Sequence, residues 1–136
     1  MAGLNERLID ENAKYMEATT LLASTVSGVL KTGKGGQLGA TKVVLRANED
    51  VSLADTKVIT LAVSDSATSG GTYVASVSAT ATASGATVYE AGAVVAEVVL
   101  PRTVLEYTKV TVTTDETTPS GKIDVFCSSP VGFTNV

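Results

Sequence analysis

Apolar and polar residues alternate in short runs along most of this chain, and turn-forming residues separate the runs. In the run KVITLAV, Ile59, Leu61 and Val63 share one side of an extended chain, while small or polar residues occupy the other side. Such alternation predicts a strand with one buried face. Repeated short β runs with turns between them are typical of a sandwich or a barrel.

The next run, TYVASVSAT, continues the pattern. Tyr73, Ala75, Val77 and Ala79 alternate with serine and threonine, and the intervening segment SDSATSGG is dense in turn formers. The two runs predict an antiparallel hairpin. With further strands expected at residues 20–30, 42–47, 94–100, 109–114 and 122–128, the chain would hold about seven or eight strands.

The segment VVLPRTVLEYTKVTV predicts a corner between two strands. In the first strand, one apolar face is expected from alternate residues, namely Val94, Ala96, Val98 and Leu100. Pro101 then removes a backbone donor and ends the strand. Beyond the corner, Val110 and Val112 differ in parity from Leu105 and Tyr107, which predicts that the inward face changes phase. A bulge or a crossing between two sheets would produce such a change.

Residues 4–16 differ from the rest, because acidic and amide residues gather there and Leu4, Leu8 and Tyr15 fall near a helical stripe. They predict a short helix or an extended arm, either docked on its own domain or reaching to a neighbour. No helical period follows residue 17, which argues against a βαβ architecture. We therefore expect an N-terminal arm over residues 1–17 and an all-β antiparallel sandwich domain over residues 18–136.

Four lysines stand near the expected strand beginnings, at positions 42, 57, 109 and 122. Lysine on an edge strand discourages stray pairing with another chain. We expect these residues to protect sheet edges, with the binding of an acidic partner surface as the alternative.

Composition limits the classes of function. The chain has 136 residues, which is one domain's length, and a net charge of -4 that offers no basic field for nucleic acid. The N-terminus lacks the pattern of a secretory signal, and no run approaches the roughly 20 apolar residues needed to cross a bilayer. The expectation is a protein made in a cytoplasm, with no nucleic-acid or membrane partner.

Catalytic and metal-binding residues are scarce. The sequence has no histidine and a single cysteine, Cys127, which excludes Ser-His-Asp and Cys-His nucleophiles. The run IDVFC predicts that this thiol is buried in a strand. Zinc or copper sites would lack their usual ligands. Hard cations stay open, because five acidic residues fall in expected loops, although solvated carboxylates are the preferred interpretation: Asp50, Asp55, Asp65, Asp115 and Glu116. No enzyme, metal or cofactor is expected.

The segment KTGKGGQLG, residues 31–39, resembles a phosphate-binding loop in its glycine content. It departs from the Walker pattern, because Gly35 follows Lys34 and another β run follows the loop. The segment predicts a flexible surface loop, or a loop that contacts a partner.

The C-terminal half carries a family resemblance. VVLPRTVLEYTKVTVT, the turn TTPSG and the strand GKIDVF resemble the closing strands of the capsid cement (decoration) proteins of tailed bacteriophages. LAVSDSATSGGTYVAS is similar to the hairpin of that family, and EATTLLASTVSGVL fits its early strand. The likeness covers roughly residues 18–127 and rests on short motifs.

The resemblance implies a jelly-roll-like sandwich on the outer surface of the virion capsid. The protein would bind the major capsid protein and stabilise its expanded lattice, as a homo-oligomer (trimer or dimer) at a capsid symmetry axis. As hypotheses, we place the capsid contacts in the N-terminal arm, in the glycine-rich loop and at the corner: Leu4, Arg7, Leu8, Lys31, Lys34, Gln37 and Arg102.

A carbohydrate-binding module, or a β-domain of a surface or pilus type, is the alternative from another class. Sugar-binding sandwiches stack aromatic rings on the sugar, and here Tyr73, Tyr107 and Phe126 fall in expected strands. Their rings could serve as core or as a binding platform.

Overall fold

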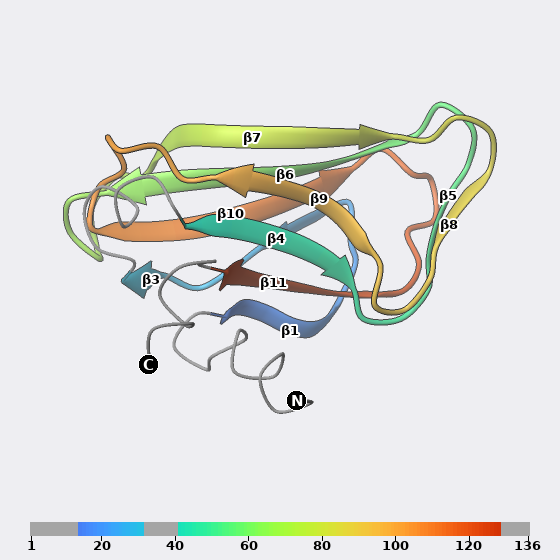
Figure 1. The fold of residues 1–136 in the computed structure, drawn as a ribbon, viewed down its shortest axis with the longest axis horizontal. Coiled ribbons are helices and arrows are strands. Elements are labelled where there is room, and N and C mark those ends of the chain that lie inside the picture. The colour runs from blue at the N-terminus through green and yellow to red at the C-terminus, as the bar shows by residue number, and fades with distance from the viewer. Residues whose placement is uncertain (1–13, 32–40, 129–136) are drawn as a thin grey trace.

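The computed structural model describes residues 14–31 and 41–128, which fold into two packed antiparallel sheets and a small two-stranded extension (Figure 1). The four-stranded sheet has the order β1-β11-β4-β9. Its strands are β1 (Lys14–Thr20), β11 (Lys122–Ser128), β4 (Lys42–Ala47) and β9 (Val94–Val99).

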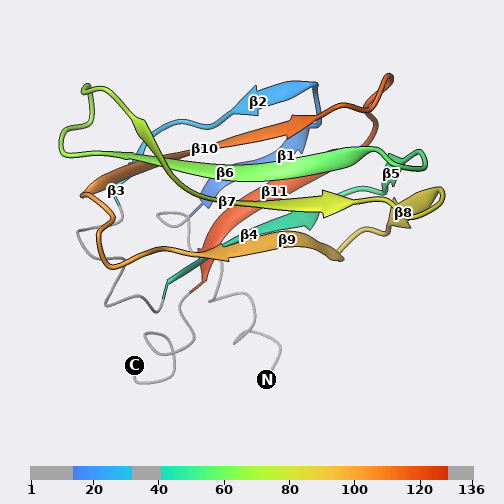
Figure 2. The same ribbon diagram turned by 90° about the horizontal axis from the view of Figure 1, so that it is seen from above.

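The five-stranded sheet has the order β2-β10-β6-β7, and β3 also pairs with β10. Its strands are β2 (Ser24–Val26), β3 (Leu30–Lys31), β10 (Tyr107–Thr114), β6 (Val58–Ser66) and β7 (Val74–Thr82). β5 (Val51–Leu53) and β8 (Thr87–Tyr89) form the two-stranded sheet at one end of the sandwich (Figures 1 and 2).

The strand pairs are nested along the chain. β6 pairs with β7, β5 with β8, β4 with β9, β2 and β3 with β10, and β1 with β11. The first half of the described chain therefore pairs with the second half in reverse order, like one long hairpin that has been rolled into two sheets. This is the jelly-roll arrangement. The expected all-β, jelly-roll-like antiparallel sandwich is confirmed.

The core lies between the two sheets and follows the predicted alternation. Ile59, Leu61 and Val63 of β6 are each fully buried, and Leu45 of β4 and Val125 of β11 meet them from the other sheet. Burying each such side chain contributes about 1.5–3 kcal/mol relative to leaving it in water. Burial of alternate residues therefore drives the sheets together.

Several expected elements agree with the structure. β4 and β11 have the predicted bounds, and the predicted hairpin is the β6–β7 pair. β5 and β8 were not expected, because runs of three residues are too short to show an alternation. The expected strand at residues 20–30 is divided, with β2 and β3 separated by Ser27, Gly28 and Val29.

The prediction for the inward face of β9 is wrong at its beginning. Val94 is 53% exposed, whereas Val95 is 8% exposed and belongs to the core. The cause is a shift of register, because Leu45 pairs with Ala96 but Arg46 pairs with Val94. Val95 is thus an extra residue at a bulge, and a bulge changes which side chains point inward.

The corner after β9 crosses between sheets as expected, since β9 belongs to the four-stranded sheet and β10 to the five-stranded one. The expected change of phase is not found. Val104, Thr108 and Val110 are buried, whereas Leu105 is 38% exposed. The inward residues on both sides of the corner therefore have the same parity.

The N-terminal part of the sandwich begins earlier than expected. β1 starts at Lys14, and Tyr15 and Met16 are buried in the core. Residues 14–17 are thus extended and paired with β11, and the expected boundary at residue 17 falls inside β1. The remainder of the expected arm lies outside the described residues.

The four lysines do not protect sheet edges. Lys42, Lys109 and Lys122 lie on β4, β10 and β11, each of which has a neighbour on both sides, and Lys57 directly precedes β6, which is also interior. The expectation of edge protection is therefore wrong. Position along the chain cannot reveal which strands become edges, because that depends on long-range pairing.

Candidate functional site

Two of the candidate contact residues lie in the described part of the chain. Lys31 is exposed on β3, where it pairs with Tyr107 of β10. Arg102 is exposed in a turn that the Val104 N–H closes by donating to the Pro101 carbonyl oxygen at 3.1 Å. The other candidates lie outside the described residues: Leu4, Arg7, Leu8, Lys34 and Gln37.

The fold brings Lys31 and Arg102 to the same end of the sandwich, although 71 positions separate them in the sequence (102 − 31). This end, here called the corner end, comprises β3, the connection from β9 to β10 and the turn between β6 and β7 (Figures 1 and 2). Within the ranges 14–31 and 41–128, neither cation forms an ion pair. The corner end therefore presents two positive charges that the described fold does not use.

Side-chain contacts hold the corner end in place. Asp65 Oδ2 accepts a hydrogen bond from the Leu105 N–H at 2.9 Å, which ties the end of β6 to the corner. The Tyr73 hydroxyl donates to the Ser69 carbonyl oxygen at 2.8 Å, and Lys109 Nζ lies 4.6 Å from the centre of the Tyr73 ring. One face of the Tyr73 ring thus already carries a cation, and that face is not open for stacking on a sugar.

The loop carboxylates bind backbone amides. At the opposite end of the sandwich, four of them accept N–H groups from distant segments: Asp50 from Ala91 at 3.0 Å, Asp55 from Gly85 at 2.8 Å, Asp115 from Val58 at 2.8 Å and Glu116 from Ala54 at 2.7 Å. Asp65 makes the same kind of bond at the corner end. Among residues 14–31 and 41–128, no three or more acidic, cysteine or histidine side chains come together in a group that could hold a metal ion. These carboxylates therefore link loops to distant segments through hydrogen bonds to backbone N–H groups.

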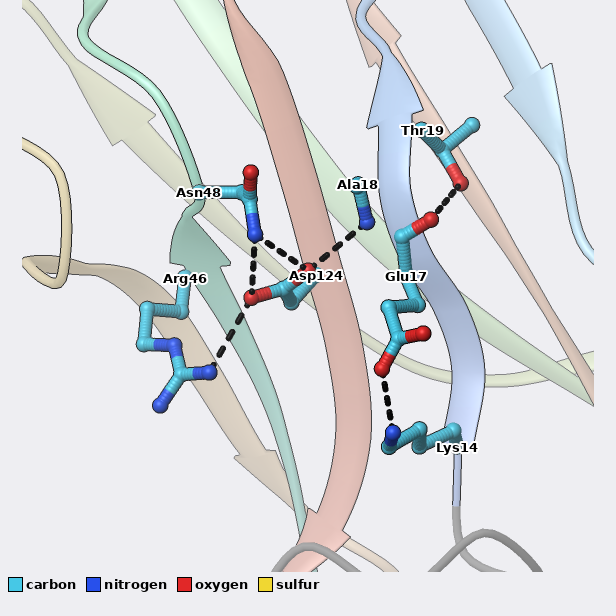
Figure 3. Close-up of polar contacts among 7 residues, drawn as sticks. All are labelled: Lys14, Glu17, Ala18, Thr19, Arg46, Asn48 and Asp124. Carbon is cyan, nitrogen blue, oxygen red and sulfur yellow. Dashed lines mark hydrogen bonds and ion pairs between the residues drawn. The ribbon is translucent and has the colours of Figure 1, made fainter.

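The densest polar cluster surrounds Asp124 on the outer face of the four-stranded sheet (Figure 3). Asp124 Oδ1 accepts the Ala18 N–H at 2.8 Å and Asn48 Nδ2 at 3.2 Å, and Oδ2 accepts Arg46 Nη2 at 3.0 Å. The cluster therefore joins β1, β11 and β4. Ala18 has a φ of +46° beside a register shift in β1, so its N–H is displaced from the regular ladder. The carboxylate supplies the missing acceptor.

Burial alone would raise the pKa of Asp124, but the hydrogen bonds from Ala18, Arg46 and Asn48 and the positive charge of Arg46 outweigh it. The pKa of this carboxyl is lowered, and the group is ionised at neutral pH. Sequence reasoning did not select Asp124 as a site residue. The sequence feature that could have indicated this site is a carboxylate inside the apolar run IDVFC, because a buried carboxylate needs hydrogen-bond partners.

The second buried polar group surrounds the cysteine. The Tyr15 hydroxyl lies 2.6 Å from Thr108 Oγ1, and Cys127 Sγ lies 3.7 Å from the same Tyr15 oxygen. Burial raises the pKa of Tyr15 above its ordinary value and raises the pKa of Cys127 to about 11. The thiol is therefore protonated at neutral pH, unlike a reactive cysteine. The prediction of a buried thiol in a strand is confirmed.

In the part of the chain that the structure describes, no helix is long and apolar enough to cross a membrane. No protein-family model matches the sequence, and no curated protein matches it.

Proposed function

We propose that this protein is a capsid cement protein, which binds the outer surface of a tailed-phage head and stabilises the expanded lattice of the major capsid protein. The observation that supports this proposal most is the position in the fold of the segment that resembles the cement proteins. Residues 98–126 run through β9, β10 and β11, and β10 and β11 are interior strands of the two sheets. The resemblance thus concerns the centre of a jelly-roll-like sandwich.

The corner end is the proposed contact with the capsid. Lys31 and Arg102 are exposed there and lack ion-pair partners among the described residues. Contacts such as Asp65 to the Leu105 N–H fix this end before binding. A surface that is already ordered loses less conformational entropy when it binds, and this improves affinity.

A cement protein acts through binding equilibria. If it binds the expanded lattice better than any other state, each bound copy shifts the population toward the intact shell. A homo-oligomer would hold several capsid subunits at once, and its avidity would strengthen modest single contacts.

The test is co-sedimentation of the purified protein with expanded empty heads that lack it, with unexpanded shells as the comparison. We expect saturable binding to the expanded heads at a fixed ratio to the major capsid protein, followed by a higher melting temperature of the shell. Absence of binding to either shell would overturn the proposal. Glycan binding by the same sample would then favour the carbohydrate-binding alternative.

Charge reversal locates the contact. The single variants Lys31→Glu and Arg102→Glu should each bind expanded heads more weakly, because both changes fall on the corner end. Lys57→Glu is the matched control, since Lys57 precedes β6 at the opposite end of the sandwich (Figure 1). Equal weakening by Lys57→Glu and by the two corner-end variants, which change the net charge by the same amount, would show that net charge, and not the corner end, controls binding.

A further inference from the structure

The four outer edges of the two sheets differ in how they are protected. An edge strand offers unpaired N–H and C=O groups to other chains, and folded proteins blunt such edges with charges, prolines, bulges or covering segments. Among the described residues the edges are β1 and β9 of the four-stranded sheet, and β7 and β2 of the five-stranded sheet.

The β1 edge carries several protective features. Lys14 and Glu17 place charges on it, and two register shifts interrupt its pairing with β11. Ala18, with φ +46°, lies within the second of these shifts, between Met16 and Thr19. A strand of this shape is a poor template for regular pairing.

The β7 and β9 edges protect each other. The two strands contact one another across the sandwich. β9 carries Glu97, and β7 has a bulge at Ser76, because Val63 pairs with Val77 and Ser64 with Ala75. The β9 edge is therefore charged, both strands have a register shift, and the contact between them partly covers each edge.

The β2 edge has none of these features. From residue 18 to residue 30 the chain contains no charged residue and no proline. Three apolar side chains of this segment are exposed: Leu22 at 55%, Val26 at 58% and Val29 at 44%. β2 lies along the rim of the sandwich (Figure 2), and no described strand pairs with its outer side.

The backbone of β2 is correctly oriented for pairing. The Ala23 carbonyl oxygen accepts the Thr114 N–H at 3.0 Å, and the Ser27 N–H donates to the Val110 carbonyl oxygen at 2.8 Å. Ala23 and Ser27 thus face β10. Alternate residues of an antiparallel strand direct their backbone groups to opposite sides, so Ser24 and Val26 direct theirs to the open side.

We propose that the β2 edge is a self-association surface, on which β2 of a second copy pairs antiparallel about a two-fold axis. The two five-stranded sheets then form one continuous sheet across the dimer. Antiparallel pairing of two identical strands is itself two-fold symmetric, so one edge satisfies both copies. The pairing stays within residues 18–30, because the charged residues Glu17 and Lys31 flank this segment on its two sides.

The absence of charge from residues 18–30 favours a second copy of this chain as the partner that binds the β2 edge. Each molecule has a net charge of -4, and a two-fold contact places identical patches against each other. Repulsion is smallest where the patch is uncharged, as the segment 18–30 is. The inference concerns the free protein and does not rest on the proposed capsid function, so it can fail or succeed independently of the co-sedimentation experiment.

The test compares two lysine substitutions by sedimentation equilibrium over a range of protein concentrations. The wild-type mass should rise with concentration from 13.8 kDa to twice that value. Val26→Lys should stay at the monomer mass, because it places charge on the paired edge. Val88→Lys is the matched control, since Val88 is 55% exposed on β8, away from this edge, and this variant should dimerise like the wild type.

Hydrogen exchange provides the second measurement and does not depend on a variant. The amides of Ser24 and Val26 should exchange more slowly at high protein concentration than at low concentration, whereas the amide of Val88 should not change. A wild-type protein that is monomeric at every concentration overturns the proposal. Dimerisation of Val26→Lys, or a mass above that of the dimer, overturns the assignment of the interface to a two-fold contact at β2.

Discussion

The outer faces of the two sheets have different chemistry although both are the polar sides of amphipathic strands. The four-stranded sheet carries ion pairs on its outer face or beside it: Arg46–Asp124 at 3.0 Å, Lys42–Glu97 at 3.6 Å, Lys122–Glu49 at 3.7 Å and Lys14–Glu17 (Figure 3 shows the first and the last). In the five-stranded sheet, the corresponding positions of β10, β6 and β7 carry mainly hydroxyl groups and methyl groups, with Lys109 as a charged residue at the corner end.

Cross-strand pairing aligns these small residues. Thr113 of β10 pairs with Thr60 of β6, which pairs with Thr80 of β7, and the hydroxyl oxygens of Thr60 and Thr80 lie 3.1 Å apart. In the neighbouring row, Thr111 pairs with Ala62, which pairs with Ser78. Neither row contains a charged residue.

One part of the difference reflects the regularity of two ladders, β1–β11 and β10–β6. β10 and β6 pair continuously from Tyr107 opposite Ser66 to Thr114 opposite Ile59, so backbone groups satisfy one another without side chains. The β6–β7 ladder has one register shift, between Val63 and Ser64, beyond the two rows of small residues. In the four-stranded sheet, both the β1–β11 and the β4–β9 ladders contain register shifts, and the β11–β4 ladder has none. Asp124 accepts the displaced Ala18 N–H beside one of these shifts. At this place in β1 a charged side chain supplies the acceptor that the ladder lacks, whereas the regular β10–β6 ladder carries small residues with β propensity.

The largest expected effect is the loss of the Asp124 carboxylate. Asp124→Ala leaves Arg46 without its partner and the Ala18 N–H without an acceptor. We expect the free energy of unfolding to fall by about 2 kcal/mol, measured by urea denaturation, because a partly buried ion pair is broken and a partly buried N–H loses its acceptor. Thr113→Ala on the other face is the control and should cost less than about 0.5 kcal/mol. Similar losses for both variants would contradict the comparison.

The second prediction concerns acid. The folded pKa of Asp124 lies below its unfolded value of about 3.9, so its stabilising contribution is complete above that value. It is lost as the pH falls through the folded pKa. Asp124→Asn removes this titration, and the difference in unfolding free energy between wild type and variant should therefore shrink below about pH 4. A difference that is constant down to pH 2 would show that Asp124 does not titrate differently in the folded state.

A smaller effect is expected for the rows of small residues on the five-stranded sheet. Thr60→Val together with Thr80→Val removes the hydroxyl contact while keeping the branched shape. The free energy of unfolding should change by less than about 1 kcal/mol, because exposed hydroxyls regain hydrogen bonds to water and valine favours strands. Thermal unfolding followed by circular dichroism measures the change. A loss as large as that of Asp124→Ala would mean that the hydroxyl rows hold the sheet together.

The smallest effect is expected for an exposed ion pair. A double-mutant cycle on Lys42 and Glu97, whose charged atoms are 3.6 Å apart, should give a coupling of about 0.2–0.5 kcal/mol. The coupling should vanish in about 1 M salt, where the screening length is roughly 3 Å. Coupling that persists in high salt would indicate a desolvated pair.

The sequence by itself determined the class of fold and its best-formed strands. The alternation in β6 predicted the burial of Ile59, Leu61 and Val63, and Pro101 marked the crossing between sheets. These features are local, because an extended chain with one apolar face must bury that face whatever its partner. The lone thiol of Cys127 was predicted as buried for the same reason.

Only the tertiary structure decided which strands are edges, where the registers shift and which side chains meet. The interior position of Lys42, the bulge at Val95 and the cluster at Asp124 all depend on pairing between distant segments. For the candidate site, the exposure of Lys31 and Arg102 could be predicted from their charge. Their position at the same end of the sandwich could not be predicted from the sequence. The physical reason is that a strand's own sequence specifies its buried face, whereas its partner and register are selected by the packing of the whole chain.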